Sequence, residues 1–313
     1  MVWPFGDPGV LLVAAVLDLA FGDPPNRIHS VAWMGRLIQS LRRLAPTTGR
    51  VGPFLAGILI LTVGLTLSGS IGLLVVWLRG IWPVPGFAME VLIMKTMFSA
   101  RDLLCAATLV QRSLVAGHLD DARRLVAWHL VSRDTSALNE SSVAAATIES
   151  VAENLSDSVV APWLFYLLGG LPAVMAFRYA NTADAMLGYR DPEREWLGKA
   201  AARFDDLLNL IPARVTAVLL LLTAPVVGGT IRGGFRIWWR DARLTASPNA
   251  GQPMAVAAGA LGVELEKIDH YRLGAGLRLP VASDIARVVQ LARVVVGVML
   301  LSLMALLGGR AWA

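Results

Sequence analysis

Three apolar runs in this 313-residue sequence are long enough to cross a lipid bilayer as helices. They are Pro53–Leu78, Arg214–Ile231 and Ile285–Leu307. The hydrocarbon core of a bilayer is about 30 Å thick, and a helix needs about 20 apolar residues to span it. The first run is rich in glycine, which favours close packing between helices in lipid. The runs therefore predict an all-α fold, a polytopic integral membrane helical bundle.

Composition and charge narrow the class of protein further. Hydrophobic residues make up 56% of the chain and charged residues 16%, whereas soluble domains carry about 25% charged residues. The single cysteine, Cys105, excludes an internal disulfide and a cysteine metal cluster. The net charge of +5 comes mostly from arginines between the apolar runs, without the basic block of a nucleic-acid binder. We expect a single membrane-embedded domain over residues 1–313, multi-pass in the cell (inner, or cytoplasmic) membrane, with no nucleic-acid partner.

Four further segments predict helices that are short, amphipathic, charged or broken. Val10–Phe21 is apolar but short, and Val31–Leu44 predicts an amphipathic helix at the membrane surface. Phe87–Ala116 reads as one helix although it carries four charges, so it lines a polar cavity or leaves the membrane in its second half. Ser158–Ala180 contains a Gly-Gly pair and a proline, which favours two short helices over one straight span.

Three acidic residues, Glu149, Glu153 and Asp157, are spaced four residues apart in a predicted helix. They drift by about 80° around a helix and therefore line one face. Three like charges repel one another, and a divalent metal ion or arginine partners would relieve the repulsion. A solvated face is the alternative, and we favour the metal or arginine-paired site. Ser132-Arg133-Asp134-Thr135 precedes this helix and supplies candidates for its N-cap.

Oxygen-bearing side chains recur later in the chain, at Asn181, Asp184, Asp205, Asp206 and Asn209. Carboxylate and amide oxygens are the hard ligands that Mg²⁺ takes alongside substrate phosphates. Asp205 and Asn209 are one turn apart and are expected to share a helix face. Arg203 and Arg214 flank this set and are suited to bidentate phosphate contacts.

Two loops also carry polar residues. The first contains Asp23, Arg27 and His29 and is either a ligand-contacting loop or a turn before an interfacial helix. The second contains Ser247 and Asn249 and opens a helix of small residues, either as an anion site or as a tight turn. The four histidines show no metal-ligand spacing, and the sequence has no P-loop or dinucleotide-binding motif.

In their order along the chain, these motifs resemble the adenosylcobinamide-phosphate synthase (cobinamide synthase) family of cobalamin biosynthesis. The resemblance covers nearly the whole chain and rests on Gly22-Asp23-Pro24 with His29 and Met34-Gly35; Ser132-Arg133-Asp134-Thr135; Thr147-Ile148-Glu149-Ser150 with Glu153-Asn154 and Asp157; Asn181-Thr182 with Asp184, Met186 and Gly188-Tyr189; Arg203 with Asp205-Asp206, Asn209 and Ile211-Pro212-Ala213-Arg214; and Ser247-Pro248-Asn249-Ala250-Gly251. Ser30 and Ser158 depart from the family pattern, where we expect proline and glycine, and both departures concern turn geometry.

The resemblance implies a membrane ligase that uses ATP, and we infer Mg²⁺ with it. The ligase would join the free propionate of adenosylcobyric acid to (R)-1-aminopropan-2-ol or its O-phosphate. A carboxylate is a poor electrophile, so the implied route forms an acyl phosphate that the amine then attacks. The active site would face the cytoplasm, with membrane lipid and other late cobalamin-pathway enzymes as further partners.

The chemistry of this reaction suggests a role for each candidate residue. Catalytic roles fall to Glu149, Glu153, Asp184 and Asp205. Metal-ligand roles fall to Glu153, Asp157, Asp205 and Asp206. Substrate-binding or phosphate-binding roles fall to Asp23, Arg27, His29, Arg133, Asp134, Thr135, Asn154, Asn181, Arg203, Asn209, Arg214, Ser247 and Asn249.

Two alternatives stay open at this point. An intramembrane Mg²⁺-dependent prenyltransferase also holds pyrophosphate with Asn/Asp-rich motifs, which Asn181-x-x-Asp184 and Asp205-Asp206-x-x-Asn209 loosely imitate. A non-enzymatic corrinoid transporter or scaffold is the second alternative. A transporter is expected to contain inverted repeats, and the sequence shows no internal repeat.

Overall fold

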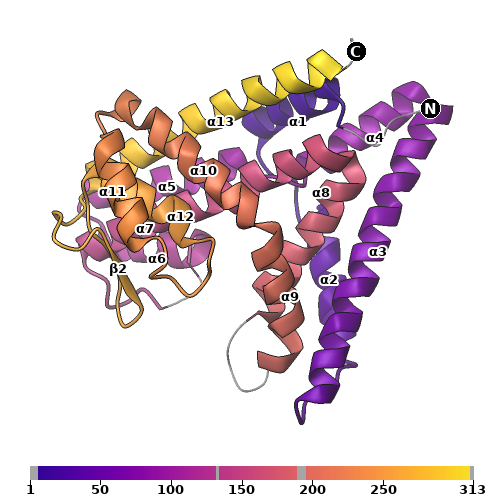
Figure 1. Ribbon diagram of the computed structural model, residues 1–313, viewed down its shortest axis with the longest axis horizontal. Helices are drawn as coiled ribbons and strands as arrows, with labels where there is room; N and C mark the ends of the chain where they lie inside the picture. The colour runs from indigo at the N-terminus through magenta and orange to yellow at the C-terminus, as the bar shows by residue number, and fades with distance from the viewer. Residues whose placement is uncertain (1–5, 132–133, 189–194, 311–313) are drawn as a thin grey trace. The chain divides into compact units, whose positions relative to one another are not determined.

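The protein is predominantly helical. This computed structural model describes residues 6–131, 134–188 and 195–310, and the only strands within them are two short ones (Figure 1). The predicted all-α class is therefore confirmed. The chain divides into two compact units: unit 1 comprises Met1–Ser99, Ala161–Leu208 and Ser302–Ala313, and unit 2 comprises Ala100–Val160 and Asn209–Leu301. That both units work as one membrane-embedded domain stays a prediction.

Within the described residues, four helical stretches are long and apolar enough to cross a membrane, judged by length and composition. Val51–Ile81, Leu210–Val227 and Ala282–Gly309 coincide with the three predicted apolar runs. The fourth stretch, Glu140–Leu187, includes the segment that the sequence predicts to be broken. The chain thus has the helices of a membrane protein, while the number of crossings and their sidedness stay predictions.

Unit 1 is built around one long apolar helix. Its helices are α1 (Pro8–Phe21), α2 (Ser30–Arg42), α3 (Val51–Ile81), α4 (Pro83–Lys95), α8 (Ala161–Leu187) and α9 (Glu195–Leu208), with the last residues of α13 (Ala282–Arg310). α3 packs against α8 and α9 (Figure 1). A Cβ atom at Gly64 would lie 1.7 Å from the Tyr179 ring, and one at Gly57 would lie 2.0 Å from the Leu197 carbonyl oxygen. Glycine is therefore required where α3 meets its neighbours, as its composition suggests.

Two other predictions about unit 1 are confirmed. α8 is interrupted at Gly169 and Gly170, where the backbone leaves the helical region and Gly170 has a φ of 62°. Pro172 lacks the N–H that would donate to the Leu168 carbonyl, so the glycines make the bend that the proline enforces. The amphipathic helix expected from Val31 corresponds to α2.

The expectation of one continuous helix over Phe87–Ala116 is wrong. α4 ends at Lys95, and the next helix begins at Ala100. The charges in α4 are buried and paired, which the sequence could not specify because their partners are distant in the chain. Glu90 accepts a hydrogen bond from Arg79 at 2.7 Å, and Lys95 lies between two aspartates of unit 1. Such pairing allows charged side chains to lie among apolar helices.

Unit 2 surrounds a helix of small residues. Its elements are α5 (Ala100–Val115), α6 (Leu119–His129), α7 (Glu140–Leu155), the π-helical turn η1 (Ser156–Val160), α10 (Leu210–Thr223), the 3₁₀ turn η2 (Ala224–Val227), α11 (Ile231–Asp241), α12 (Gly251–Leu261), β1 (Leu265–Lys267), β2 (Tyr271–Leu273) and most of α13. Every residue of α12 is buried, and α7, α10 and α11 pack on it. A helix that is apolar on all sides is expected to lie in the interior. The β1–β2 hairpin, which the sequence analysis does not predict, turns through Asp269 at a φ of 61°.

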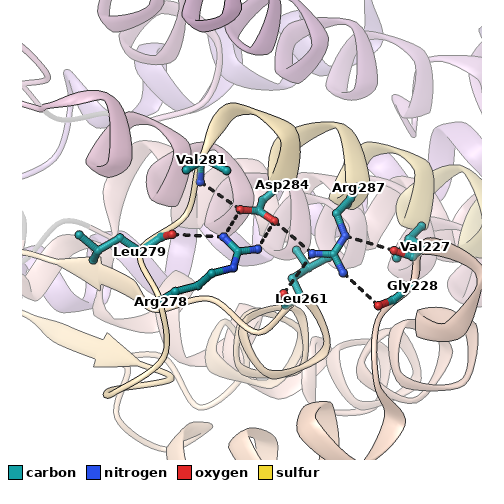
Figure 2. A network of polar contacts seen from close by, with 8 residues as sticks. All are labelled: Val227, Gly228, Leu261, Arg278, Leu279, Val281, Asp284 and Arg287. Atoms are coloured by element: carbon teal, nitrogen blue, oxygen red, sulfur yellow. Dashed lines mark hydrogen bonds and ion pairs between the residues drawn. The ribbon is translucent and has the colours of Figure 1, made fainter.

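A polar network joins three helical segments of unit 2. Figure 2 shows the buried carboxylate of Asp284 between Arg278 and Arg287, which donate to it at 2.7 and 3.1 Å. Asp284 also accepts the backbone N–H of Val281 at 3.0 Å and so caps the start of α13. Arg287 donates further hydrogen bonds to the carbonyl oxygens of Val227, Gly228 and Leu261. These carbonyls end η2 and α12, where the helices themselves provide no partner.

Replacing Arg287 by glutamine is expected to lower the free energy of unfolding by about 2–4 kcal/mol, because three terminal carbonyls and Asp284 each lose a donor. Thermal unfolding of the detergent-solubilised full chain measures the effect. Arg293 is the matched control, since it lies on the same helix and has no hydrogen bond or ion pair to any described residue. Arg293→Gln is expected to change stability by less than about 0.5 kcal/mol. Equal losses in both variants would show that the network does not hold unit 2 together.

Candidate functional site

In unit 2, the predicted polar motifs lie on elements that pack against one another. α7 and α10 both contact α12, and η1, which continues α7, contacts α10. Glu149 on α7, Asn209 at the start of α10 and Asn249 just before α12 are each at most 5% exposed. Burying polar side chains is unfavourable unless they have polar partners, so their burial on neighbouring elements marks a polar site within this unit.

Arg214 connects two motifs that are distant in the sequence. Its Nη1 donates to Asn249 Oδ1 at 3.2 Å and to the carbonyl oxygen of Leu210 at 2.7 Å. The backbone N–H of Asn249 in turn donates to Ser247 Oγ at 3.2 Å. Both bonds of Arg214 use one of its nitrogens, and a guanidinium has five N–H donors. The exposed Arg214 side chain therefore retains donors for a phosphate or carboxylate.

The acidic row of α7 is shorter than the sequence predicts. Glu149 and Glu153 lie one turn apart in α7, but Asp157 lies in the π-helical turn η1, so the α-helical spacing does not extend to it. Pro162 gives a physical reason, because its ring excludes an α-helical bond to the carbonyl of Ser158. A π-turn inserted before a proline changes the register of the helix, and such turns are frequent at functional sites.

Lys267 is a cation at this site that the sequence analysis did not select. It lies on β1, which packs against α7, and its positive charge acts on the half-buried Glu153. No local signal in the sequence reveals this proximity, because 114 positions separate the two residues (267 − 153).

The predicted N-cap of the acidic helix is wrong. Asn139 caps α7 by accepting the backbone N–H of Ser142 at 2.9 Å, because the helix begins only at Glu140. Asp134 instead accepts hydrogen bonds from the backbone and side chain of Ser136, both at 2.9 Å, and these bonds lower the pKa of Asp134.

Three further predicted residues flank this region. Thr135 is buried and donates to the carbonyl oxygen of Arg123 at 2.9 Å, a structural contact. Asn154 donates to the backbone carbonyl of Ser150 at 2.9 Å, which leaves its own carbonyl oxygen as the group suited to support a ligand. Arg133 lies outside the described residues.

In unit 1, a second group of predicted residues gathers between α8 and α9. Asn181 donates to Asp205 Oδ1 at 3.3 Å and accepts from Arg178 at 3.3 Å, which orients its amide. Asp205 is 8% exposed on α9. Asn209 lies beyond the end of α9 and precedes α10, so the expected single helix face shared by Asp205 and Asn209 is wrong.

A cavity of about 260 Å³ adjoins this group in unit 1. Lys199, Arg203 and Asp206 on α9 line it together with Gly188 at the end of α8. A Cβ atom at Gly188 would lie 2.0 Å from Asp184 Oδ1, so the Asp184 side chain lies against Gly188 and requires glycine there. Lys199 is a candidate phosphate ligand that the sequence analysis missed. It lies four residues before Arg203, and this spacing indicates that the two side chains are neighbours on one face of a helix.

The Asp23 loop forms a separate cluster in unit 1. Lys95 Nζ lies 2.7 Å from Asp23 and 3.2 Å from the buried Asp18, and His29 Nε2 lies 3.8 Å from Asp23. Burial alone would raise the pKa of Asp23, but hydrogen bonds from His29 and Lys95 outweigh it and lower the pKa from 3.8 to about 2. His29 caps α2 by accepting the Val31 N–H at 3.2 Å. The cluster is thus consistent with the structural alternative, with Arg27 left exposed beside it.

The donor set in unit 1 is compatible with Mg²⁺ bound together with phosphates. No three histidine, cysteine or acidic side chains among the described residues group tightly enough to hold a metal ion by themselves. Mg²⁺ usually takes one or two carboxylates and completes its shell with water and substrate phosphates. Asp205 and Asp206, with the amide of Asn181, supply such a partial set. The metal role of Glu153 and Asp157 in unit 2 stays a prediction.

Comparison with known proteins identifies the family. The model of the family described as CobD/Cbib protein matches residues 11–297, which include every site residue discussed above. The chain belongs to the CobD/Cbib family. It therefore takes part in cobalamin biosynthesis, as the resemblance implied.

Relatives align with nearly the whole CobD/Cbib chain. The cobalamin biosynthesis protein CobD of Dehalococcoides mccartyi is 43% identical over 270 residues, 86% of this chain and 87% of the relative. The CobD protein of Geobacter metallireducens is 44% identical over 84% of this chain and 82% of its own length. The probable CobD protein of Methanothermobacter thermautotrophicus is 40% identical over 85% and 86% of the two chains. No solved structure matches the chain.

Asp23→Asn is expected to lower the free energy of unfolding by about 1–3 kcal/mol at pH 7, because the buried Lys95 loses a charged partner. Since folding lowers the pKa of Asp23 from 3.8 to about 2, its contribution is present above pH 4 and is lost as the pH falls toward 2. The difference in unfolding temperature between wild type and variant should therefore shrink over that range. Asp269→Asn, in the exposed hairpin turn, is the control. A difference that persists unchanged at pH 2 would contradict the lowered pKa.

Proposed function

We propose that this chain is an ATP-dependent amide ligase of cobalamin biosynthesis. Its substrates are adenosylcobyric acid and (R)-1-aminopropan-2-ol or its O-phosphate, and its product is adenosylcobinamide or adenosylcobinamide phosphate. The observation that carries the proposal is the gathering of the motifs behind the family resemblance on packed elements, with Arg214 bound to Asn249 in unit 2 and Asn181 bound to Asp205 in unit 1.

Activation of the propionate is the first chemical requirement. The carboxylate oxygen attacks the γ-phosphorus of ATP, the bond to ADP breaks, and an acyl phosphate forms. In unit 1, Arg203 and Lys199 are suited to bind phosphate oxygens and to reduce the repulsion between phosphate and carboxylate. In unit 2, Arg214 is the residue with donors of the same kind. Asp205, Asp206 and Asn181 would hold Mg²⁺, which neutralises phosphate charge when it is bound.

Amide formation is the second step. The amine nitrogen attacks the acyl carbon, the carbon–oxygen bond breaks, and inorganic phosphate leaves. The ammonium that forms must lose a proton, and a carboxylate is a suitable acceptor when it is held close to the nitrogen. Glu149, Glu153, Asp184 and Asp205 are the candidates for this role. Asp23 is a weaker candidate than these four, because its lowered pKa makes it a poor base.

The two alternatives differ from this proposal in their products. The family match supports cobalamin biosynthesis and lends no support to a prenyltransferase, which would make no corrinoid product. A transporter or scaffold would bind corrinoid without consuming ATP for amide formation. We further propose that the protein is multi-pass in the inner membrane and that its site faces the cytoplasm, where ATP is available.

The full chain in lipid nanodiscs, given ATP, Mg²⁺, adenosylcobyric acid and each amine in turn, is expected to form the amide with one ADP and one phosphate per product. Mass spectrometry identifies the product, and the faster of the two amines is the natural substrate. Asp205→Asn and Glu153→Gln are each expected to lower the rate by about 10²-fold or more, as loss of a metal ligand or proton acceptor does.

Asp269→Asn, on the exposed hairpin turn, serves as the control and is expected to retain the wild-type rate. Unfolding temperatures of all variants separate lost chemistry from lost folding. If neither amine gives a corrinoid amide, the ligase proposal is wrong. If the amide forms but both variants keep the wild-type rate, the assignment of these two residues is wrong.

A further inference from the structure

The exposed surface of α11 is divided into two rows of different chemistry. Ile231, Phe235 and Trp239 recur every four residues and form an apolar row. Arg232 and Arg236 lie about 100° further around the helix and form an arginine row, and the exposed Arg243 follows just beyond the last helical residue, Asp241. The third face of α11, which includes Gly234 and Ile237, is buried where α11 packs on α12.

The apolar row exposes large aromatic side chains. Trp239 is 85% exposed and Phe235 is 51% exposed, and their rings stack with centroids 6.3 Å apart. Trp is enriched where a membrane meets water, because its ring is apolar and its N–H is polar. A stacked aromatic pair on the outside of a helix is therefore suited to the boundary between lipid headgroups and acyl chains.

The arginine row has no acidic partner among the described residues. Arg232, Arg236 and Arg243 make no ion pair or hydrogen bond there, whereas the neighbouring Arg240 binds the buried Asp241 at 2.6 and 2.8 Å. The two guanidinium groups of the row attract anions and bind phosphate oxygens well. With a rise of about 1.5 Å per residue, Arg232 and Arg236 lie one turn, roughly 6 Å, apart along the axis, so both can reach phosphates on one surface.

The position of α11 in the chain places its start beside candidate membrane spans. Three residues separate the end of the span Leu210–Val227 from the start of α11 at Ile231. Arg287 donates hydrogen bonds to the Val227 and Gly228 carbonyls, so the start of the span Ala282–Gly309 lies beside the end of the span Leu210–Val227 (Figure 2). The first turn of α11 therefore lies beside the end of the first span and the start of the second.

We propose that α11 is an interfacial helix that binds anionic phospholipids. Its apolar row inserts below the headgroups, and its arginine row contacts headgroup phosphates. A membrane surface matches both rows, since it offers an apolar layer beneath a sheet of phosphates, whereas a soluble phosphate compound would leave the aromatic pair in water. This lipid contact is separate from the proposed ligase reaction and does not depend on it.

Site-directed spin labelling of the full chain tests the proposal. Cys105 is the only cysteine, so Cys105→Ala gives a background in which Trp239→Cys or Ile231→Cys carries a single label. Asp269→Cys, on the exposed hairpin turn of the same unit, is the aqueous control. Collision rates with oxygen, which enters lipid, and with a water-soluble nickel chelate measure the depth of each label in vesicles of phosphatidylcholine with and without phosphatidylglycerol.

Labels at positions 231 and 239 are expected to show an oxygen-to-nickel ratio several-fold above that at position 269, and phosphatidylglycerol should raise it further. Arg232→Gln/Arg236→Gln should abolish the added effect of phosphatidylglycerol, whereas Arg112→Gln, which removes an exposed charge from α5, should not. Ratios at 231 and 239 equal to that at 269 would overturn the proposal. A phosphatidylglycerol effect that is absent, or that millimolar inorganic phosphate abolishes, would overturn the role of the arginine row.

Discussion

A buried carboxylate held between two arginines determines how unit 2 is assembled. Asp284 caps α13, and Arg287, which it orients, binds the carbonyl groups that end η2 and α12. In an apolar bundle, unpaired backbone carbonyls and isolated charges are both strongly unfavourable, and this network satisfies them together. Because α12 is the buried centre on which α7 and α10 pack, fixing its end fixes the elements that carry Glu149, Asn209 and Asn249.

The same principle explains where the candidate site residues lie. Polar side chains on apolar helices are stable where they find partners, so they collect at the few places where helices present complementary groups. Arg214 with Asn249 in unit 2 and Asn181 with Asp205 in unit 1 are such places. An amide ligase needs this arrangement, since it must hold phosphates and a carboxylate away from bulk water. The proposed function thus uses some groups, such as Asn249 and Asp205, whose burial also contributes to the fold.

The sequence predicted what depends on local pattern. Apolar runs gave the membrane helices, the Gly-Gly pair gave the break in α8, and motif order gave the family. It could not give features that depend on partners far along the chain. The pairing of Lys95 with Asp23 and the effect of Lys267 on Glu153 arise only in the folded protein. The π-turn η1 and the cap at Asn139 depend on where the helix starts and bends, and the acidic spacing alone does not fix either.

The central proposal is that this protein activates a propionate as an acyl phosphate. Adenosylcobyric acid labelled with ¹⁸O in that carboxyl group provides the most direct test, because the activated oxygen leaves with the phosphate. Mass spectrometry of the released phosphate after one turnover should find one labelled oxygen, with the other retained in the amide. Label found in AMP would contradict a phosphoryl intermediate, and amide formation without transfer of label to any phosphate would contradict ATP-dependent activation.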